Sequence, residues 1–441
     1  MGSEATEAIR RAAVWFEPDI DGFGGLFDFI DEADMVLIGE ATHGTEEFYR
    51  IRAELTKALI IRKGFNIVAV EADWPDAYRV NRWVRLRSGD TDAESALSAF
   101  TRFPRWMWRN TVVADFVTWL RQHNASREER ERTGFYGLDL YSLHTSMAAV
   151  LEYLDRVDPA AAARARYRYS CFEDYGEEPQ AYGYAAAFDM SRSCQDQVIA
   201  QLVDLQRRAA EYGNRDGHIA ADDYFFAEQN ARLVSNAERY YRSMFAGRPD
   251  SWNLRDTHMA ETLDALVQHM TRTYGHARAV VWAHNSHLGD ARATDVANIG
   301  QLNLGQLVRE RVGQRSRLIG FTTHTGTVTA AANWDEPPQR MRVRVSRADS
   351  YEHLFHDVGL AQFALLMNDS GVREVLRSAR LERAIGVIYR PDTERISHYF
   401  PARLAEQFDA VMHIDETHAL QPLEQWARDE LDLPDTYPSA L

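Results

Sequence analysis

The chain has 441 residues, of which 45% are hydrophobic and 26% are charged, and its formal net charge is -16. This length and composition suit a globular protein with one large α/β domain that carries an insertion, or with two domains. The acidic balance argues against nucleic acid or an anionic membrane as a partner, and it tolerates a cationic small molecule. No stretch is long and apolar enough for a signal peptide or a transmembrane helix.

The two cysteines, Cys171 and Cys194, have no metal-type spacing and do not suggest a disulfide framework. A reducing compartment is the simplest interpretation of this cysteine content. The sequence therefore predicts a cytoplasmic protein.

The first elements of the chain predict two helices within residues 1–30 and then a βαβ unit within residues 35–73. Both apolar runs of that unit end abruptly in polar residues. Ligands of parallel sheets lie beyond the carboxyl ends of the strands, so we expect Glu40, His43 and Glu71 to share one crevice. An imidazole between two carboxylates is a good general-base arrangement, because a carboxylate fixes the tautomer and raises the basicity.

The helix between these two strands adds Arg52 to the candidate site. This residue lies one helical turn after Phe48, beside the stripe of apolar residues that faces the core. A buried arginine needs an anionic partner, and the strand ends offer Glu40 and Glu71. Such a pair is either a structural ion pair or a part of the catalytic apparatus, and the sequence leaves both open.

A helix at 75–87 comes next, followed by a segment dense in aromatic and basic residues at 103–109 that contains Trp106. This cluster is either an edge of the core or a wall of a substrate site. A third strand is predicted at 134–139, with Asp139 at its exit.

Residues 143–275 have almost no strand signal, and we interpret them as a helical insertion that forms a cap between two parts of the core, 1–142 and 276–441. Strands return in the last part, alternating with helices. The predicted strands are 279–283, 317–321, 363–366, 385–389 and 410–413. The fold class is therefore α/β, with a mainly parallel sheet flanked by helices and a large helical insertion over the carboxyl ends of the strands.

Two histidines, His284 and His287, follow the strand at 279–283, where the crevice requires functional side chains. Together with the residues after the first strands they suit a metal-free acid–base site or a metallohydrolase. The sequence has no HExxH and no His-x-His pattern that would favour a metal. Nucleophilic catalysis is less favoured still, because there is no Gly-x-Ser-x-Gly elbow and neither cysteine lies in a catalytic motif.

These motifs resemble those of the erythromycin esterase family, in the same order and over most of the chain. The opening block is Gly39-Glu40-Ala41-Thr42-His43-Gly44 with Glu47-Phe48 and Arg52, then Gly64-Phe65 and Val70-Glu71. The later blocks are Phe135-Tyr136-Gly137-Leu138-Asp139, Arg255-Asp256 with Met259-Ala260-Glu261, and Trp282-Ala283-His284-Asn285-Ser286-His287. At the Arg255 block the match is imperfect, since Thr262 stands where members of the family often carry Asn.

The resemblance implies an α/β core with helical additions and hydrolysis of an ester or lactone without a metal or other cofactor. His43 would activate water, Glu40 and Glu71 would orient His43 and that water, and Arg52 and His284 would position or stabilise the reacting carbonyl. We place His287, Arg255, Asp139 and Trp106 among the residues that bind the substrate.

Three alternatives remain open at this point. The chain could be a metal-dependent hydrolase, a biosynthetic cyclase or lyase that uses the same base, or a non-enzymatic protein that binds a small ligand or a metal-porphyrin through its histidines.

Overall fold

The computed structural model describes residues 2–30, 32–175, 179–187, 193–213, 218–245, 248–424 and 428–429. Among these residues the central sheet contains nine strands in the order β11-β6-β5-β1-β4-β2-β3, with β10 paired to both β5 and β7. The strands are β1 (Met35–Ile38), β2 (Ile67–Asp73), β3 (Gly134–Asp139), β4 (Ala279–Trp282), β5 (Ser316–Ala330), β6 (Gln339–Val343), β7 (Gln362–Leu366), β10 (Ala410–Thr417) and β11 (Arg428–Asp429). A separate antiparallel pair joins β8 (Arg380–Arg383) to β9 (Tyr399–Ala402).

The middle of the sheet is parallel, as predicted. Leu37 of β1 lies opposite Val281 of β4 on one side and Leu318 of β5 on the other. All four residues of β1 are buried, as expected of a parallel strand with both faces covered. Antiparallel pairing is confined to β6 and β7, which join β5 and β10.

Helices cover the sheet and account for most of its connections. They are α1 (Gly2–Ala12), α2 (Gly24–Ile30), α3 (Glu46–Lys63), α4 (Trp74–Val84), α5 (Ala93–Leu97), α6 (Thr111–Ala125), α7 (Leu143–Val157), α8 (Pro159–Tyr169), α9 (Pro179–Ala187), α10 (Gln195–Arg207), α11 (Ala209–Gly213), α12 (His218–Ser243), α13 (Arg248–Tyr274), α14 (Asn285–Leu288), α15 (Leu304–Val312), α16 (Tyr351–His356), α17 (Ser370–Val375), α18 (Glu394–Ser397) and α19 (Leu404–Gln407).

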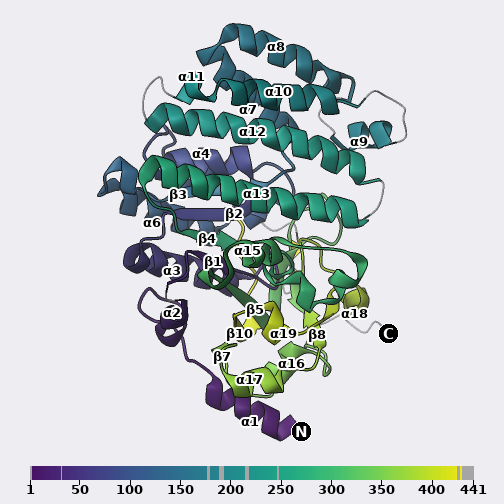
Figure 1. Cartoon of the computed structure of the whole chain (residues 1–441). Coiled ribbons are helices and arrows are strands. Elements are labelled where there is room, and N and C mark those ends of the chain that lie inside the picture. The colour runs from purple at the N-terminus through teal and green to yellow at the C-terminus, as the bar shows by residue number, and fades with distance from the viewer. Residues whose placement is uncertain are drawn as a thin grey trace, which may run out of the picture.

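The α-helices α7 to α13 lie within residues 143–275, the segment that the sequence analysis interprets as a helical insertion. Figure 1 shows α7, α8, α10 and α12 stacked beyond α13, at the end of the molecule opposite the N-terminal helix α1. Helix α13 lies against the sheet, where Leu263, Leu266 and Met270 share a core with Ile67 and Leu138. The long helix α13 therefore joins the insertion to the sheet.

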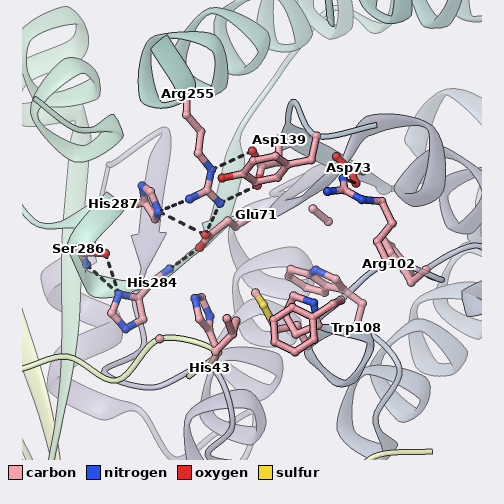
Figure 2. Close-up of a pocket in the computed structure, with 18 of the residues that line it drawn as sticks. His43, Glu71, Asp73, Arg102, Trp108, Asp139, Arg255, His284, Ser286 and His287 are labelled. Atoms are coloured by element: carbon pink, nitrogen blue, oxygen red, sulfur yellow. Dashed lines mark hydrogen bonds and ion pairs between the residues drawn. The ribbon is translucent and has the colours of Figure 1, made fainter. Parts of the chain in front are cut away.

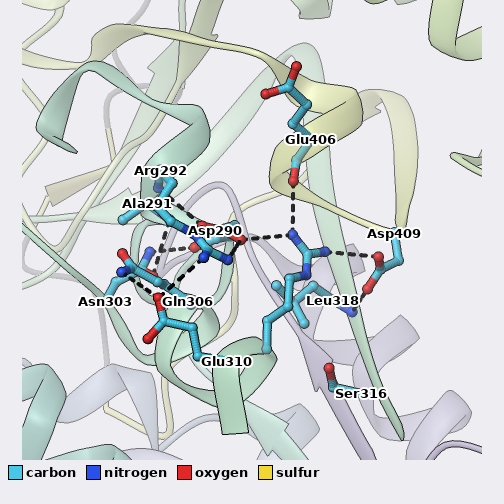
Figure 3. Close-up of polar contacts among 12 residues, drawn as sticks. Asp290, Ala291, Arg292, Asn303, Gln306, Glu310, Ser316, Leu318, Glu406 and Asp409 are labelled. Atoms are coloured by element: carbon cyan, nitrogen blue, oxygen red, sulfur yellow. Dashed lines mark hydrogen bonds and ion pairs between the residues drawn. The ribbon is translucent and has the colours of Figure 1, made fainter. Parts of the chain in front are cut away.

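A polar network fixes the segment that follows α14 against β5 and β10 (Figure 3). Arg309 of α15 donates to Asp290 at 3.1 Å and to Asp409 at 2.8 Å. The other carboxylate oxygen of Asp409 accepts the backbone N–H of Leu318, at 2.8 Å. Charge-assisted bonds of this kind tie the segment after α14 to the amino-terminal ends of β5 and β10.

Two sequence-based predictions are wrong. Residues 385–389 do not form a strand. They make two isolated bridges, to Thr42 and to Ala331, because this segment runs past the loop after β1 and the end of β5 instead of pairing along the sheet. A disulfide bond joins Cys171 to Cys194. The turn η3 (Ser170–Tyr175) carries Cys171 and places it next to Cys194, at the start of α10. The separation of the two cysteines along the sequence does not reveal this contact. The cysteine content therefore gives no support for a reducing compartment.

None of the described helices has the length and apolarity needed to cross a bilayer.

Candidate active site

A cavity of about 410 Å³ opens beyond the carboxyl ends of β1, β2 and β4. The predicted residues that line it are His43, Glu71, Asp139, Arg255, His284 and His287. Figure 2 shows these side chains converging from separate elements, with His43 and His284 on one side and Trp108 and Arg102 on the other. The structure thus brings together six residues that the sequence assigned to one crevice.

The loop after β1 is held in place by close backbone packing. A Cβ atom on Gly39 would lie 2.2 Å from Oδ1 of Asn285, and one on Gly44 would lie 1.8 Å from the carbonyl oxygen of Thr329. Only glycine permits these approaches. Ile385 also holds this loop in place, because its backbone N–H donates to the Ala41 carbonyl at 2.8 Å. His43 therefore sits on a rigid loop at the end of a buried strand.

Glu40, His43 and Arg52 form a buried hydrogen-bonded chain with Glu40 in the middle. Nδ1 of His43 lies 2.9 Å from Oε1 of Glu40, and Nη2 of Arg52 donates to Oε2 of Glu40 at 2.7 Å. A carboxylate at Nδ1 holds the proton there and leaves Nε2 as the basic nitrogen of a ring that lines the cavity.

Arg52 differs in two ways from its predicted role. Among the described residues its only ion pair is with Glu40; it makes none with Glu71, because it lies behind the loop after β1. It is also fully buried and absent from the cavity lining, with its guanidinium 4.3 Å from the Tyr49 ring centroid and 5.2 Å from that of Trp282. It therefore positions Glu40 and does not reach a bound carbonyl group.

Glu71 belongs to a second network, centred on Arg255 (Figure 2). Nη2 of Arg255 donates to Glu71 at 2.7 Å and to Asp139 at 2.6 Å. The other oxygen of Glu71 accepts the backbone N–H of His284 at 2.9 Å. Burial would raise the pKa of Glu71, but His287 and Arg255 hold it well below its usual range. Glu71 is therefore an ionised carboxylate at the wall of the cavity.

His287 lies between two carboxylates and an aromatic ring. Its Nδ1 is 2.9 Å from Asp256, its Nε2 is 3.3 Å from Glu71, and its ring stacks on Trp252 with centroids 4.6 Å apart. Burial would lower the pKa of His287, but Asp256 and Glu71 outweigh it and raise the pKa to about 9. A neutral ring would accept from Arg255 Nη1, which is 3.0 Å from Nε2, whereas the protonated ring donates to Glu71. The raised pKa favours the protonated form at neutral pH.

The pKa of His284 is shifted in the opposite direction to that of His287. Burial and the neighbouring His43 lower its pKa to about 3, so the ring is neutral. Its Nδ1 accepts the backbone N–H of Ser286 at 3.3 Å and lies 2.8 Å from the Ser286 hydroxyl. The proton of the neutral ring therefore resides on Nε2, which is buried and makes no hydrogen bond of good geometry among the described residues, with the Ala41 carbonyl as its nearest acceptor. The His284 and His43 ring centroids are 4.8 Å apart, so a weakly bonded N–H donor lies beside the candidate base.

The far side of the cavity carries a second acidic group, which the sequence analysis did not place in the site. Asp73 pairs with Arg102 at 2.9 Å, and among the described residues its buried Oδ1 makes no hydrogen bond of good geometry. Burial and the neighbouring Asp73 raise the pKa of Asp76 to about 8. The signal for Asp73 was available, since it lies two residues after Glu71 and side chains alternate along a strand.

Trp106 is the one predicted site residue other than Arg52 and Glu40 that does not line the cavity. It packs edge-on against Phe103, with centroids 5.4 Å apart, while Trp108 faces the cavity. The tight turn η1 (Arg105–Met107) places these two tryptophans in different directions. The sequence analysis identified the aromatic segment but selected Trp106, whereas Trp108 is the tryptophan of this segment that lines the cavity.

A larger cavity of about 700 Å³ adjoins the first and shares five lining residues with it, namely Tyr141, Trp252, Arg255, Ser286 and Ala384. Arg255 stacks on Tyr141 with its guanidinium 5.0 Å from the ring centroid. The two cavities together have room for a ligand much larger than the group that reacts beside His43.

The arrangement can perform acid–base chemistry. It contains an oriented imidazole, an ionised carboxylate, a neutral histidine with a weakly bonded donor and a protonated histidine. Its histidine and carboxylate atoms do not converge as metal ligands in the part of the chain that the structure describes.

The erythromycin esterase family model matches residues 60–417. The matched segment begins C-terminal to His43 and includes Glu71 and His284. Erythromycin esterase type I of Escherichia coli is 23% identical over 330 residues, which cover 72% of this chain and 77% of that protein. The type II enzyme of Escherichia coli is 21% identical over 325 residues, covering 71% and 74% of the two proteins. A putative hydrolase of Bacillus subtilis, YbfO, is 20% identical over 311 residues, covering 66% and 65%.

Solved structures share the fold over nearly the whole chain. A succinoglycan biosynthesis protein superposes with a TM-score of 0.75 at 20% identity, covering 96% of this chain and 98% of that one. A mutant of the erythromycin esterase EreC in its open conformation superposes with a TM-score of 0.64 at 18% identity, covering 90% and 94%.

Proposed function

The chain belongs to the erythromycin esterase family, and we propose that it hydrolyses a carboxylic ester or lactone with water activated by His43. The observation that carries this proposal is the 2.9 Å contact between Glu40 and Nδ1 of His43, in a ring that lines a cavity. The family supports a hydrolase. The ester bond and the base are our assignment.

In the proposed first step, Nε2 of His43 takes a proton from water while the water oxygen attacks the carbonyl carbon. Glu40 accepts the Nδ1–H and stabilises the imidazolium that forms, and Glu71 orients the water. The electron pair of the carbonyl double bond moves onto the carbonyl oxygen. Nε2–H of His284 donates to this oxyanion, because among the described residues it makes no hydrogen bond of good geometry that would hold it elsewhere.

In the second step the carbon–oxygen bond to the alcohol breaks. His43 returns its proton to the departing alkoxide oxygen, so the products are a carboxylic acid and an alcohol. For a lactone the two groups remain in one opened chain.

We also propose that the substrate carries a cationic group. The acidic side chains of Glu71, Asp73, Asp76 and Asp139 line the cavity with the cations Arg102, Arg255 and His287, so ionisation of Asp76, whose pKa is raised to about 8, leaves one excess negative charge for a cationic ligand. Oδ1 of Asp73 and the buried Asp76 offer a binding point for an ammonium group opposite His43. Phe100, Trp108 and Val387 supply apolar contacts between the two ends.

A mass-spectrometric screen of macrolactones and aminoglycosyl esters, scored for the gain of one water, tests the proposed reaction. His43→Ala should lower turnover by about 10²–10⁴-fold, the usual contribution of a general base. His418→Ala is a matched control, because His418 also pairs with a glutamate, Glu47, at 2.7 Å but is exposed and lies outside the cavity. A folded His43→Ala variant with turnover equal to that of the His418→Ala variant would overturn the assignment.

A further inference from the structure

A second cluster of histidines lies away from the cavity, where β5, β10 and α16 meet. His324 belongs to the second half of β5, Asp415 to β10 and His356 to the end of α16. One nitrogen or oxygen atom from each of these three residues lies within 4.8 Å of the corresponding atoms of the other two. None of the three lines the cavity beside His43.

Hydrogen bonds pre-orient the three side chains. Nδ1 of His324 lies 2.6 Å from the Ser346 hydroxyl, and Nδ1 of His356 lies 2.8 Å from Asp415. The His324 and His356 rings stack in parallel, with centroids 3.6 Å apart and planes inclined by 6°. The electron pair of an imidazole nitrogen lies in the plane of the ring, so both rings can bind one ion only after the half-exposed His356 ring rotates out of this stack.

His413 supplies an independent observation that points to a ligand. It is fully buried, and its Nδ1 is 2.9 Å from the Thr322 hydroxyl. Its Nε2 lies 3.5 Å from Oδ1 of Asp415, a long contact, and has no closer hydrogen-bond partner among the described residues. A buried imidazole nitrogen with only this long contact is incompletely satisfied, and a cation bound beside Asp415 would give it a better partner.

We propose that His324, His356 and Asp415 bind a divalent transition-metal ion, with His413 as a further ligand. Imidazole nitrogen and carboxylate oxygen suit zinc and its neighbours cobalt and nickel, whereas magnesium and calcium prefer oxygen ligands alone. This set also has the usual supporting contacts, since hydroxyl groups of Ser346 and Thr322 fix the nitrogens that do not face the cluster.

Metal binding requires a contraction of the cluster and a rotation of the His356 ring out of its stack on His324. Tetrahedral zinc with bonds of about 2.0–2.2 Å brings its ligand atoms to roughly 3.4 Å from one another. His356 and Asp415 can supply this movement, because their side chains are 42% and 29% exposed. His324 and His413 are buried and provide the fixed side of the site.

The ion would join the helix α16 to two strands behind one wall of the cavity. Arg383 donates to the carbonyl of Thr323 at 2.6 Å and to that of His324 at 2.9 Å. The next residues, Ala384 and Gly386, line the cavity. The proposed site is therefore structural, and it lies outside the catalytic chemistry assigned to His43.

The test uses the full-length protein, stripped with a chelator and then titrated with Zn²⁺ by calorimetry and by thermal unfolding, and with Co²⁺ by visible absorption. We expect one equivalent to bind to the cluster, a higher Tm and the d–d bands of a low-symmetry Co²⁺ site. His356→Ala and Asp415→Asn should each weaken binding by at least the 10–100-fold that loss of a supporting contact typically costs.

Two further variants locate the bound ion. A His43→Ala/His284→Ala double variant should bind Zn²⁺ as the wild type does, and so should His418→Ala. Far-ultraviolet circular dichroism of the metal-free variants establishes that they are folded. Failure of the wild type to bind Zn²⁺, or binding that the His43/His284 variant loses and the His356 and Asp415 variants keep, would overturn the proposal. Neither outcome depends on whether the protein hydrolyses an ester.

Discussion

Replacing Arg52 with methionine distinguishes the catalytic and structural roles of a buried arginine. Methionine keeps much of the apolar stem but removes the charge that faces Oε2 of Glu40 at 2.7 Å. Arg52 and Glu40 are 0% and 1% exposed, so water has little access to the site of the lost charge. The substitution leaves the Glu40 carboxylate buried without its counter-ion.

The structural and catalytic costs can be worked out separately. Removing one partner of a buried ion pair typically costs about 3–5 kcal/mol of stability, because the remaining charge is not compensated. Glu40 also orients His43 at 2.9 Å, and loss of the carboxylate that orients a catalytic histidine costs up to about 10⁴-fold in turnover. We expect Arg52→Met to lower turnover per folded molecule by roughly 10²–10⁴-fold.

Two companion variants sharpen the experiment. Arg52→Lys keeps the charge but loses the planar group that stacks on Tyr49, so its turnover should also be severely impaired. The double variant Arg52→Met/Glu40→Gln replaces both charges, and it should recover part of the lost stability without recovering turnover.

The assay measures turnover per folded molecule together with the free energy of unfolding in urea. Arg85→Met is the matched control, because Arg85 is equally buried and pairs with Asp222 at 3.2 Å but lies outside the cavity. It should lose stability and keep its turnover per folded molecule. If Arg52→Met behaves in the same way, Arg52 is structural and the positioning role assigned to it is wrong.

Exhaustive chelation should leave turnover unchanged, because His43 is proposed to activate water without a metal; loss of turnover that zinc restores both in the wild type and in the His356→Ala variant would indicate a metal-dependent hydrolase. Because the pKa of His287 is raised to about 9 from 6.5, its contribution to stability is complete below pH 6.5 and is lost as the pH rises through 9. Urea unfolding across this range should show the loss, and His287→Gln should flatten it. Binding of a small tertiary amine should release protons near pH 7, because the pKa of Asp76 is raised to about 8 and a bound cation favours the ionised carboxylate. Calorimetry in two buffers of different ionisation enthalpy measures this release, and Asp76→Asn should abolish it. Gly44→Ala should cost more than about 3 kcal/mol, because its Cβ would lie 1.8 Å from the Thr329 carbonyl oxygen, whereas Gly386→Ala meets open space; thermal unfolding of the two variants provides the comparison.

The sequence by itself determined the parts of the site that depend on local patterns. A short apolar run followed by polar residues identifies a parallel strand and its exit, and the exits of β1, β2 and β4 carry Glu40, His43, Glu71, His284 and His287. Their convergence follows from the topology, because parallel strands present their carboxyl ends at one edge of a sheet. The helical spacing after His43 likewise placed Arg52 on the buried side of α3.

Only the tertiary structure decided which partners these residues have. The sequence offered both Glu40 and Glu71 to Arg52, but the packing of α3 gives it Glu40, and the long helix α13 carries Arg255 to Glu71 across 184 positions of the sequence. The direction of Trp106 and Trp108, the bond between Cys171 and Cys194, and the path of residues 385–389 were decided in the same way. Each depends on contacts between segments far apart in the chain, and local hydrophobic periodicity carries no information about such contacts.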